Sequence, residues 1–198
     1  MNPYKIVDEF EKVIANWAGA RYGVAVESAS AALFLCCELL KVKEVEIPCH
    51  TYPSVPNAII HAGGKVRFTK EKWSGVYELK PYGIIDGALR FQPGMYNGGL
   101  HCLSFHMKKH LPIGRGGMIL TDSEEAYKYF KKARFDGRDE VPLQDDTFTQ
   151  LGWNMYMTPE QASRGLMLFS TIHFKNLDDI PVELQGYPDL SQYEIYTS

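Results

Sequence analysis

The sequence has no long apolar run, no basic tract and no recurring cysteine pattern, and each absence excludes a class of protein. No stretch approaches the roughly 20 apolar residues that a membrane-spanning helix needs, so no membrane contact is expected. The formal net charge is -3 and there is no arginine-rich run, which gives no reason to expect nucleic acid as a partner. Residues 1–14 carry acidic side chains where a secretory signal needs an apolar segment, which predicts a cytoplasmic protein.

The four cysteines form neither a zinc motif nor a disulfide framework. Cys36 and Cys37 are adjacent, whereas Cys49 and Cys102 are isolated. Buried, reduced thiols are therefore expected. His50 follows Cys49 and could be a metal ligand. Without a second cluster in the sequence, a packed or interface histidine is the better interpretation, and no metal is predicted.

Short apolar runs alternate with helical patterns along most of the chain. A length of 198 residues, with 45% hydrophobic and 23% charged residues, is typical of one globular domain with a substantial core. Apolar runs bounded by turn residues predict strands at 22–26, 45–48, 65–68, 83–85, 101–105 and 118–120. Helical spacing and capping residues predict helices at 7–17, 28–40, 51–61, 123–135 and 159–169.

This alternation predicts an α/β fold, with a three-layer, mostly parallel sheet and helices on both faces. Residues 1–175 are assigned to that domain. Residues 176–198 are polar and contain proline and glycine, and they are expected to form an irregular, extended tail that packs on a partner subunit.

A loop with two lysines between apolar runs is the central feature of the sequence. The run 101–105 leads into His106-Met107-Lys108-Lys109, and a Gly-rich turn at 114–117 leads into the next run. Two strands joined by a tight loop are the plain interpretation. A lysine at a strand edge can act as a Schiff-base amine, because burial makes it lose its proton readily. Taken alone, a solvated surface lysine is the commoner explanation.

Three other groups of polar side chains also follow predicted strands. Ser28 and Ser30 open a helix, where they could belong to an anion site or merely cap the helix. Tyr52 could stack on a flat ring or pack in a core or interface. Asp86 could pair with a protonated ring nitrogen or with backbone N–H groups. If the strands are parallel, these residues and the lysine loop share the carboxyl edge of the sheet, where ligands bind in such folds.

Together these segments resemble the DegT family of pyridoxal-phosphate-dependent nucleotide-sugar aminotransferases, within the fold-type I transferases. Six blocks occur in the family's order between about residue 10 and residue 169. They are Ser28-Ala29-Ser30-Ala31-Ala32-Leu33, Pro48-Cys49-His50-Thr51-Tyr52, Asp86-Gly87-Ala88-Leu89, Ser104-Phe105-His106-Met107-Lys108-Lys109, Gly114-Arg115-Gly116-Gly117, and Gly152-Trp153-Asn154-Met155-Tyr156-Met157 with Gln161-Ala162-Ser163-Arg164-Gly165. The resemblance implies the large-domain fold of those transferases.

The resemblance also implies a role for each of seven residues toward pyridoxal 5'-phosphate. Lys109, and not Lys108, aligns with the catalytic lysine that carries the cofactor. Asp86 aligns with the carboxylate that keeps the pyridine nitrogen protonated, so that the ring can accept electrons. The other implied cofactor contacts are made by Ala29 and Ser30 at the phosphate, Tyr52 on the ring, Ser104, and Asn154 on the phosphate in the neighbouring subunit.

The implied function is transfer of an amino group from an amino acid, glutamate by family habit, to a keto nucleotide-sugar. A homodimer with shared active sites is implied as well. Three departures favour an alternative, a catalytically impaired, dimeric cofactor-binding or structural relic. Leu89 stands where the family has Gln or His, Arg115 where it has an acid, and Tyr156 where it has arginine.

Length and spacing favour the same alternative. The chain ends where the family's C-terminal domain would begin, and the segment between residues 68 and 84 looks shortened by one strand–helix unit. A third interpretation makes the lysine incidental on a generic nucleotide-binding sheet. No Gly-x-Gly-x-x-Gly motif supports it.

Overall fold

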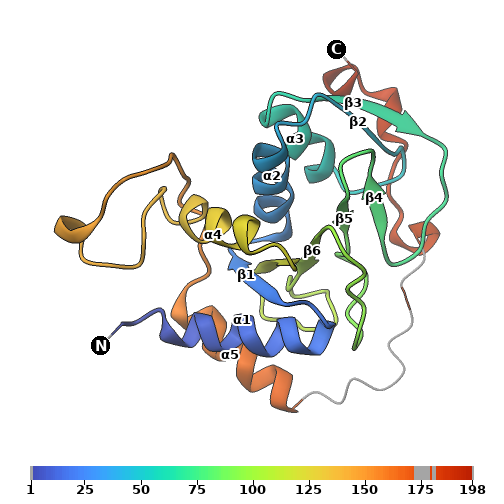
Figure 1. Cartoon of the computed structure of the whole chain (residues 1–198). Coiled ribbons are helices and arrows are strands. Elements are labelled where there is room, and N and C mark those ends of the chain that lie inside the picture. The colour runs from blue at the N-terminus through green and yellow to red at the C-terminus, as the bar shows by residue number, and fades with distance from the viewer. Residues whose placement is uncertain (1, 172–178, 180–181, 198) are drawn as a thin grey trace.

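The computed structural model describes residues 2–171, 179 and 182–197, and it confirms the α/β class (Figure 1). The strands are β1 (Tyr22–Val26), β2 (Glu44–Pro48), β3 (Lys65–Thr69), β4 (Tyr77–Leu79), β5 (Ile84–Asp86), β6 (Leu100–Ser104) and β7 (Gly117–Thr121). The α-helices are α1 (Lys5–Ala18), α2 (Ala29–Leu40), α3 (Ser54–His61), α4 (Glu124–Ala133) and α5 (Pro159–Thr171). Only β4 has no counterpart among the predicted elements.

The sheet is mixed, which corrects the expected predominance of parallel pairs. Five strands have the order β1-β7-β6-β5-β4, and β2 pairs with β3 beside them. The pairs β1–β7, β6–β7 and β4–β5 are antiparallel, whereas β5–β6 and β2–β3 are parallel. The antiparallel pairs β4–β5 and β6–β7 follow from their connections. A short turn joins β4 to β5 and a glycine-containing loop joins β6 to β7, and direct connections of this kind join antiparallel neighbours.

Five strands nevertheless share one direction. β1 and β6 both run antiparallel to β7, and β5 runs parallel to β6. A bridge between Glu46 and Lys80 sets β2 antiparallel to β4, and therefore in the direction of β5. The carboxyl ends of β1, β2, β3, β5 and β6 consequently lie at one edge, as the sequence argument requires.

Helices cover both faces of the sheet (Figure 1). Helices α2, α3 and α4 contribute to one core, in which Val24, Cys102 and Ile119 face the helices. Helices α1 and α5 contribute to the other, in which Ala25 and Leu103 point to the opposite side. Successive residues along β1 and β6 therefore point alternately into the two cores, as expected for strands that are buried on both faces. All four cysteines are buried free thiols, as predicted.

The described C-terminal residues 182–197 form short 3₁₀ turns, so the expectation of an extended tail is wrong for them. The turns are η2 (Val182–Gln185), η3 (Leu190–Gln192) and η4 (Glu194–Tyr196). They pack on the chain itself: Leu190 is buried, and its N–H donates to the Cys49 carbonyl over 2.9 Å. The predicted domain boundary at residues 175 and 176 lies outside the described residues. None of the helices in the described ranges is long and apolar enough to cross a bilayer.

Candidate functional site

A cavity of about 630 Å³ lies at the shared carboxyl edge of the strands. Ligand sites typically enclose roughly 300–1,000 Å³, so this one can hold a small molecule. Six of the seven predicted site residues line it: Ala29, Ser30, Tyr52, Asp86, Ser104 and Lys109. The seventh, Asn154, is exposed outside this lining and donates a hydrogen bond to Asp136 Oδ2 over 3.3 Å.

Asp86 is the last residue of β5, and its carboxylate is held from two sides. It is only 6% exposed. Its Oδ2 accepts a hydrogen bond from the Tyr77 hydroxyl over 3.0 Å, and its Oδ1 accepts one from the Ala88 N–H over 3.0 Å. Burial raises the pKa of Asp86, and these hydrogen bonds and the charge of Lys109 oppose that rise. A buried carboxylate with a fixed orientation can pair with a cationic ligand group.

Lys109 follows β6 in the loop that leads to β7, and its backbone N–H donates to the His106 carbonyl over 2.8 Å. Lys109 is half-buried, whereas the neighbouring Lys108 is exposed. Burial lowers the pKa of Lys109, and the charge of Asp86 acts against that. A lowered pKa makes the neutral amine more available for attack on a carbonyl carbon. Both lysines line the cavity, and the difference between them is that Lys109 is the more buried.

The loop after β1 supplies a helix N-terminus to the cavity. Ser28 is the N-cap of α2, and its Oγ accepts a hydrogen bond from the Ala31 N–H over 3.1 Å. Ser28 therefore caps the helix, and both Ser28 and Ser30 line the cavity. The first N–H groups of a helix lack intrahelical partners and carry partial positive charge, which suits an anion.

Gly117, the first residue of β7, makes room for this loop. A Cβ atom at residue 117 would lie 2.4 Å from the Ser28 carbonyl carbon and 2.6 Å from the Ala29 nitrogen. Real side chains do not approach backbone that closely. The glycine of the Gly-rich turn therefore brings the start of α2 against β7, beside the lysine loop.

Tyr52 lies in the cavity lining and is 59% exposed. Its ring centroid is 6.1 Å from that of Tyr187, at an interplanar angle of 66°. Tyr187 and Pro188 belong to the C-terminal segment and also line the cavity. Burial raises the pKa of Tyr187 to about 12, and the charge of Asp86 adds to this shift. The C-terminal segment thus forms one wall of the site.

Sequence reasoning missed Tyr77, Thr51 and Tyr187. Tyr77 stands opposite Asp86 in the β4–β5 pair, and its hydroxyl lies 2.5 Å from Thr51 Oγ1. Recognising β4 as a strand would have placed Tyr77 beside the aspartate. Tyr187 is far from the cavity in sequence, and nothing in its local pattern points there.

The three departures from the DegT pattern each have local contacts. Leu89 is buried in the wall of the cavity. Arg115 forms an ion pair with Glu27. The Tyr156 ring packs against Tyr4 and Phe135, with centroid distances of 5.6 and 5.1 Å.

Comparison with known proteins decides the ancestry of this site. Residues 1–72 and 94–178 match the DegT/DnrJ/EryC1/StrS aminotransferase family. The chain belongs to this family. Asp86 lies in the gap between the two segments that match the family. Its proposed role in the site therefore depends on the sequence block around it and on the geometry described above.

Relatives in this family are considerably longer. The chain is 24% identical over 209 residues to a UDP-4-amino-4,6-dideoxy-N-acetyl-beta-L-altrosamine transaminase of Campylobacter jejuni, covering 82% of this chain and 56% of the relative. It is 27% identical to the spore coat polysaccharide biosynthesis protein SpsC of Bacillus subtilis, covering 60% of this chain and 42% of SpsC. The chain therefore spans about half the length of these curated relatives.

Solved structures show the same fold. AtS13 from Actinomadura melliaura superposes with a TM-score of 0.73 at 21% identity, covering 84% of this chain and 60% of AtS13. These comparisons support the arrangement of strands and helices around the cavity.

Proposed function

We propose that this chain is a pyridoxal-phosphate-dependent aminotransferase that transfers an amino group from an amino acid, with glutamate as the expected donor, to a keto nucleotide-sugar. The observation that carries the proposal is that buried Asp86 and half-buried Lys109 line one cavity together with the start of α2. The matched family is one of aminotransferases, and the Campylobacter jejuni relative is named as a nucleotide-sugar transaminase.

The chemistry of the cavity lining fits pyridoxal 5'-phosphate group by group. Asp86 offers a carboxylate to a pyridinium nitrogen, and Lys109 offers an amine to an aldehyde. The start of α2, with Ala29 and Ser30, offers N–H and hydroxyl donors to a phosphate, and Ser104 adds a further hydroxyl. Tyr52 offers an aromatic face to the ring. The cofactor, when bound, supplies an electron sink for the carbanion formed at the substrate α carbon.

Asp86 and Lys109 then have different roles toward protons in the reaction. Asp86 holds a proton on the ring nitrogen, because its buried carboxylate stabilises the cationic form. With the cofactor bound, Lys109 Nζ would be the base that accepts the proton of the substrate α carbon and later returns it. Its lowered pKa favours the neutral form of the amine that such a base needs.

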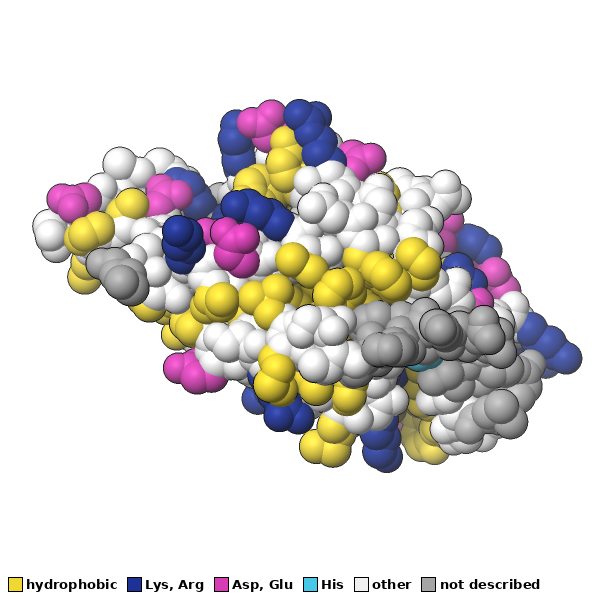
Figure 2. Space-filling model, turned by 90° about the horizontal axis from the view of Figure 1, so that it is seen from below, with side chains coloured by type: hydrophobic (Ala, Val, Ile, Leu, Met, Phe, Trp, Pro, Cys, Tyr) yellow, Lys and Arg dark blue, Asp and Glu magenta, His cyan; other side chains and the backbone are white. Residues whose placement is uncertain are grey.

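We further propose a cytoplasmic homodimer in which Asn154 reaches the partner's phosphate site. Asn154 is exposed, as a residue that acts in another subunit must be. The preceding loop carries exposed apolar side chains: Val141, Leu143, Phe148 and Leu151. Figure 2 shows hydrophobic side chains in a band across the face seen from below. Apolar surface of this kind is typical of protein–protein contacts.

The test is the reaction of the purified chain with pyridoxal phosphate, followed by borohydride reduction and peptide mapping. We expect the reduced adduct on Lys109, a visible absorption band before reduction, and loss of both in Lys109→Ala. Lys108→Ala is the matched control and should keep both. An adduct on Lys108, or an unchanged band in Lys109→Ala, would refute the assignment of the lysine.

The alternative function is a cofactor-binding relic. It is favoured by Leu89, Arg115 and Tyr156, which depart from the DegT pattern. Addition of glutamate to the loaded protein distinguishes the two functions. Bleaching of the visible band with release of 2-oxoglutarate supports the transferase, whereas a stable band supports the relic.

A further inference from the structure

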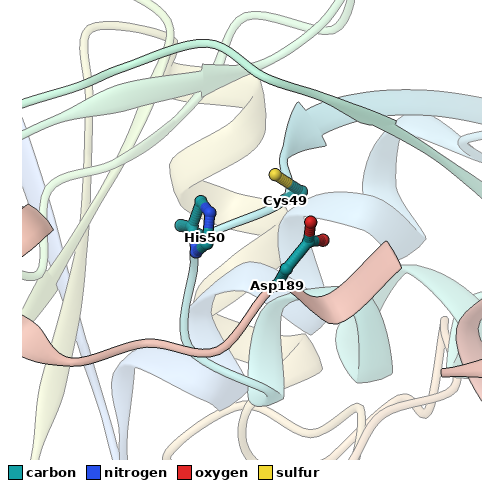
Figure 3. A group of neighbouring side chains, drawn as sticks. All are labelled: Cys49, His50 and Asp189. Carbon is teal, nitrogen blue, oxygen red and sulfur yellow. The ribbon is translucent and has the colours of Figure 1, made fainter. Parts of the chain in front are cut away.

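Outside the cavity lining, one cluster of metal-ligating side chains lies where the C-terminal segment meets the end of β2. Cys49 and His50 directly follow β2, and Asp189 directly precedes η3. The sulfur, a ring nitrogen and a carboxylate oxygen of these residues lie within 4.8 Å of one another. Figure 3 shows the three side chains gathered around one space between the strand end and the C-terminal segment.

The backbone brings these two segments together independently of the side chains. His50 and Asp189 form an antiparallel bridge, and the Leu190 N–H donates to the Cys49 carbonyl over 2.9 Å. The Trp73 indole N–H donates to the His50 carbonyl over 3.0 Å. The donor atoms are therefore held on a paired backbone, which reduces the entropy that a ligand must overcome to order them.

The side chains of Asp189 and His50 are each oriented by a neighbour. Asp189 Oδ1 accepts hydrogen bonds from the Ser191 N–H over 3.0 Å and from Ser191 Oγ over 2.5 Å, which leaves Oδ2. His50 Nδ1 lies 3.1 Å from the Tyr187 carbonyl. A proton on Nδ1 donated to that carbonyl leaves Nε2 as the free acceptor, an arrangement that metal-binding histidines commonly show.

We propose that Cys49, His50 and Asp189 bind a Zn²⁺ ion, with a water molecule as the fourth ligand. Thiolate, imidazole and carboxylate are the donors that zinc takes in proteins, in tetrahedral geometry. Zinc–ligand distances of ~2.0–2.3 Å place tetrahedral donors ~3.3–3.8 Å apart, so separations of up to 4.8 Å need to shrink by at most ~1.0–1.5 Å.

Charge and proton balance are consistent with this ion. Cys49 is 4% exposed, and its thiol is hydrogen-bonded to Asp189. Binding breaks the S–H bond, forms the S–Zn bond and releases the proton to solvent. One thiolate and one carboxylate then neutralise the two charges of the ion.

The ion would fasten the C-terminal segment to the sheet. Tyr187 stands two residues before Asp189, and Tyr52 two residues after His50, so the zinc site fixes the backbone that carries both aromatic walls of the cavity. The inference does not depend on the proposed function, because zinc binding is measured without pyridoxal phosphate.

The first experiment is a titration of the chelator-treated chain of 198 residues with Co²⁺ alone, followed by displacement with Zn²⁺. We expect one Co²⁺ per chain, with a near-ultraviolet thiolate-to-cobalt band that Zn²⁺ abolishes. Asp189→Asn, which preserves shape, should weaken Co²⁺ binding at least tenfold, and His50→Ala should do the same. His61→Ala, an exposed histidine on α3, is the matched control and should bind as the wild type does.

The variants are first compared by circular dichroism, so that loss of binding is not confused with loss of fold. A wild-type chain without the thiolate band, or wild-type affinity in folded Asp189→Asn, overturns the proposal. Hydrogen exchange tests the fastening separately. Zn²⁺ should slow exchange of the Leu190 amide in the wild type and not in Asp189→Asn, and an unchanged rate in the wild type would contradict that role.

Discussion

The carboxylate of Asp86 is hydrogen-bonded by Tyr77, a residue outside the DegT motifs. The Tyr77 hydroxyl lies between Asp86 Oδ2, at 3.0 Å, and Thr51 Oγ1, at 2.5 Å. Burial raises the pKa of Tyr77 well above its usual value, and the nearby charge of Asp86 adds to this, so the phenol remains a donor. Tyr77 therefore acts as a positioning residue for the carboxylate.

We expect Tyr77→Phe to weaken pyridoxal phosphate binding by about tenfold, because one hydrogen bond to a buried charge contributes roughly 1.5–3 kcal/mol. Fluorescence titration measures the affinity, and the pH dependence of the visible band reports whether the ring environment has changed. Tyr82→Phe is the control, since the Tyr82 hydroxyl accepts from the Lys43 N–H over 2.7 Å at an exposed position. Equal losses in both variants would contradict a specific role for Tyr77.

His101 on β6 is a buried neutral histidine. It is 3% exposed, and its Nε2 has no hydrogen-bond partner among the described residues. Burial lowers the pKa of His101 from 6.5 to about 4, and the charge of Arg90 adds to the shift. The unfolded chain therefore binds a proton between those values when the folded chain does not, and stability falls as the pH is lowered through this window.

A shift of this size corresponds to about 3 kcal/mol in total, of which about 2 kcal/mol is lost by pH 5. We expect urea unfolding to report this loss between pH 7 and pH 5 in the wild type. His101→Gln should lose less than the wild type over the same interval. The exposed His61→Gln should retain the wild-type difference, and an undiminished difference in His101→Gln would show that other groups cause it.

Single residues were predictable where chemistry and local sequence agree. Lys109 and Asp86 each follow an apolar strand, and both line the cavity as expected. Tyr77 and Tyr187 were not predictable, because their roles depend on a hairpin and on a distant segment. Asp189 was missed for the same reason: the sequence places no second donor near Cys49 and His50.

At the level of elements, a buried ionic cluster joins α1, β1 and α4. Arg134, at the end of α4, is 1% exposed and forms ion pairs with Glu11 and Glu140. It also donates to the Ala25 carbonyl, and the Ala25 N–H donates to Glu11 Oε1 over 2.8 Å. The strand that leads into the α2 loop is therefore fixed by charges on two helices.

Removal of Arg134 breaks its two buried ion pairs and leaves Lys131 as the remaining cation beside Glu11 and Glu140, and the loss of a buried partner costs up to about 3–5 kcal/mol. We expect Arg134→Met to lower the free energy of unfolding by about that amount in urea titrations. Lys128→Met is the control, because Lys128 pairs with Glu124 on the exposed side of the same helix, and its unfolding midpoint should hardly change. Similar midpoints for the two variants would show that the cluster is not needed for the fold.

Helices and most strands follow from the periodicity of the sequence, but their pairing does not. The helical spacing of Phe10, Ile14 and Trp17 and the short run 22–26 both correspond to elements of the structure. The antiparallel β4–β5 and β6–β7 pairs arise from the lengths of their connections, which apolar patterning does not record. The prediction that the site residues share one edge of the sheet still holds, because among the described strands only β4 and β7 run in the opposite direction.

For the whole molecule, the cavity is lined by segments that are far apart in the chain. The chain covers 56% of its Campylobacter jejuni relative, and here its C-terminal segment supplies Tyr187 and Pro188 to the cavity wall. In the homodimer proposed above, a second copy adds Asn154. Asn154 lies outside the lining of its own cavity, on the strand-like segment that bridges Phe135.

This arrangement predicts complementation between two defective chains. In the proposed homodimer, Lys109→Ala removes the amine and Asn154→Ala removes the proposed phosphate contact, so each variant homodimer has two damaged sites. A mixed dimer has one site with Lys109 from one chain and Asn154 from the other, and one site that lacks both. We therefore expect coexpressed, differently tagged variants, purified as mixed dimers, to bind one pyridoxal phosphate per dimer with wild-type affinity.

Cofactor affinity is the appropriate measurement, because it does not require turnover. The control is a mixed dimer of wild type with the Lys109→Ala, Asn154→Ala double variant. Each of its two sites lacks one of the two residues, so neither should bind tightly. Tight binding in the control and not in the mixture of single variants would place both residues in the site of one chain. Tight binding in the mixture alone requires that each site be completed by the neighbouring subunit.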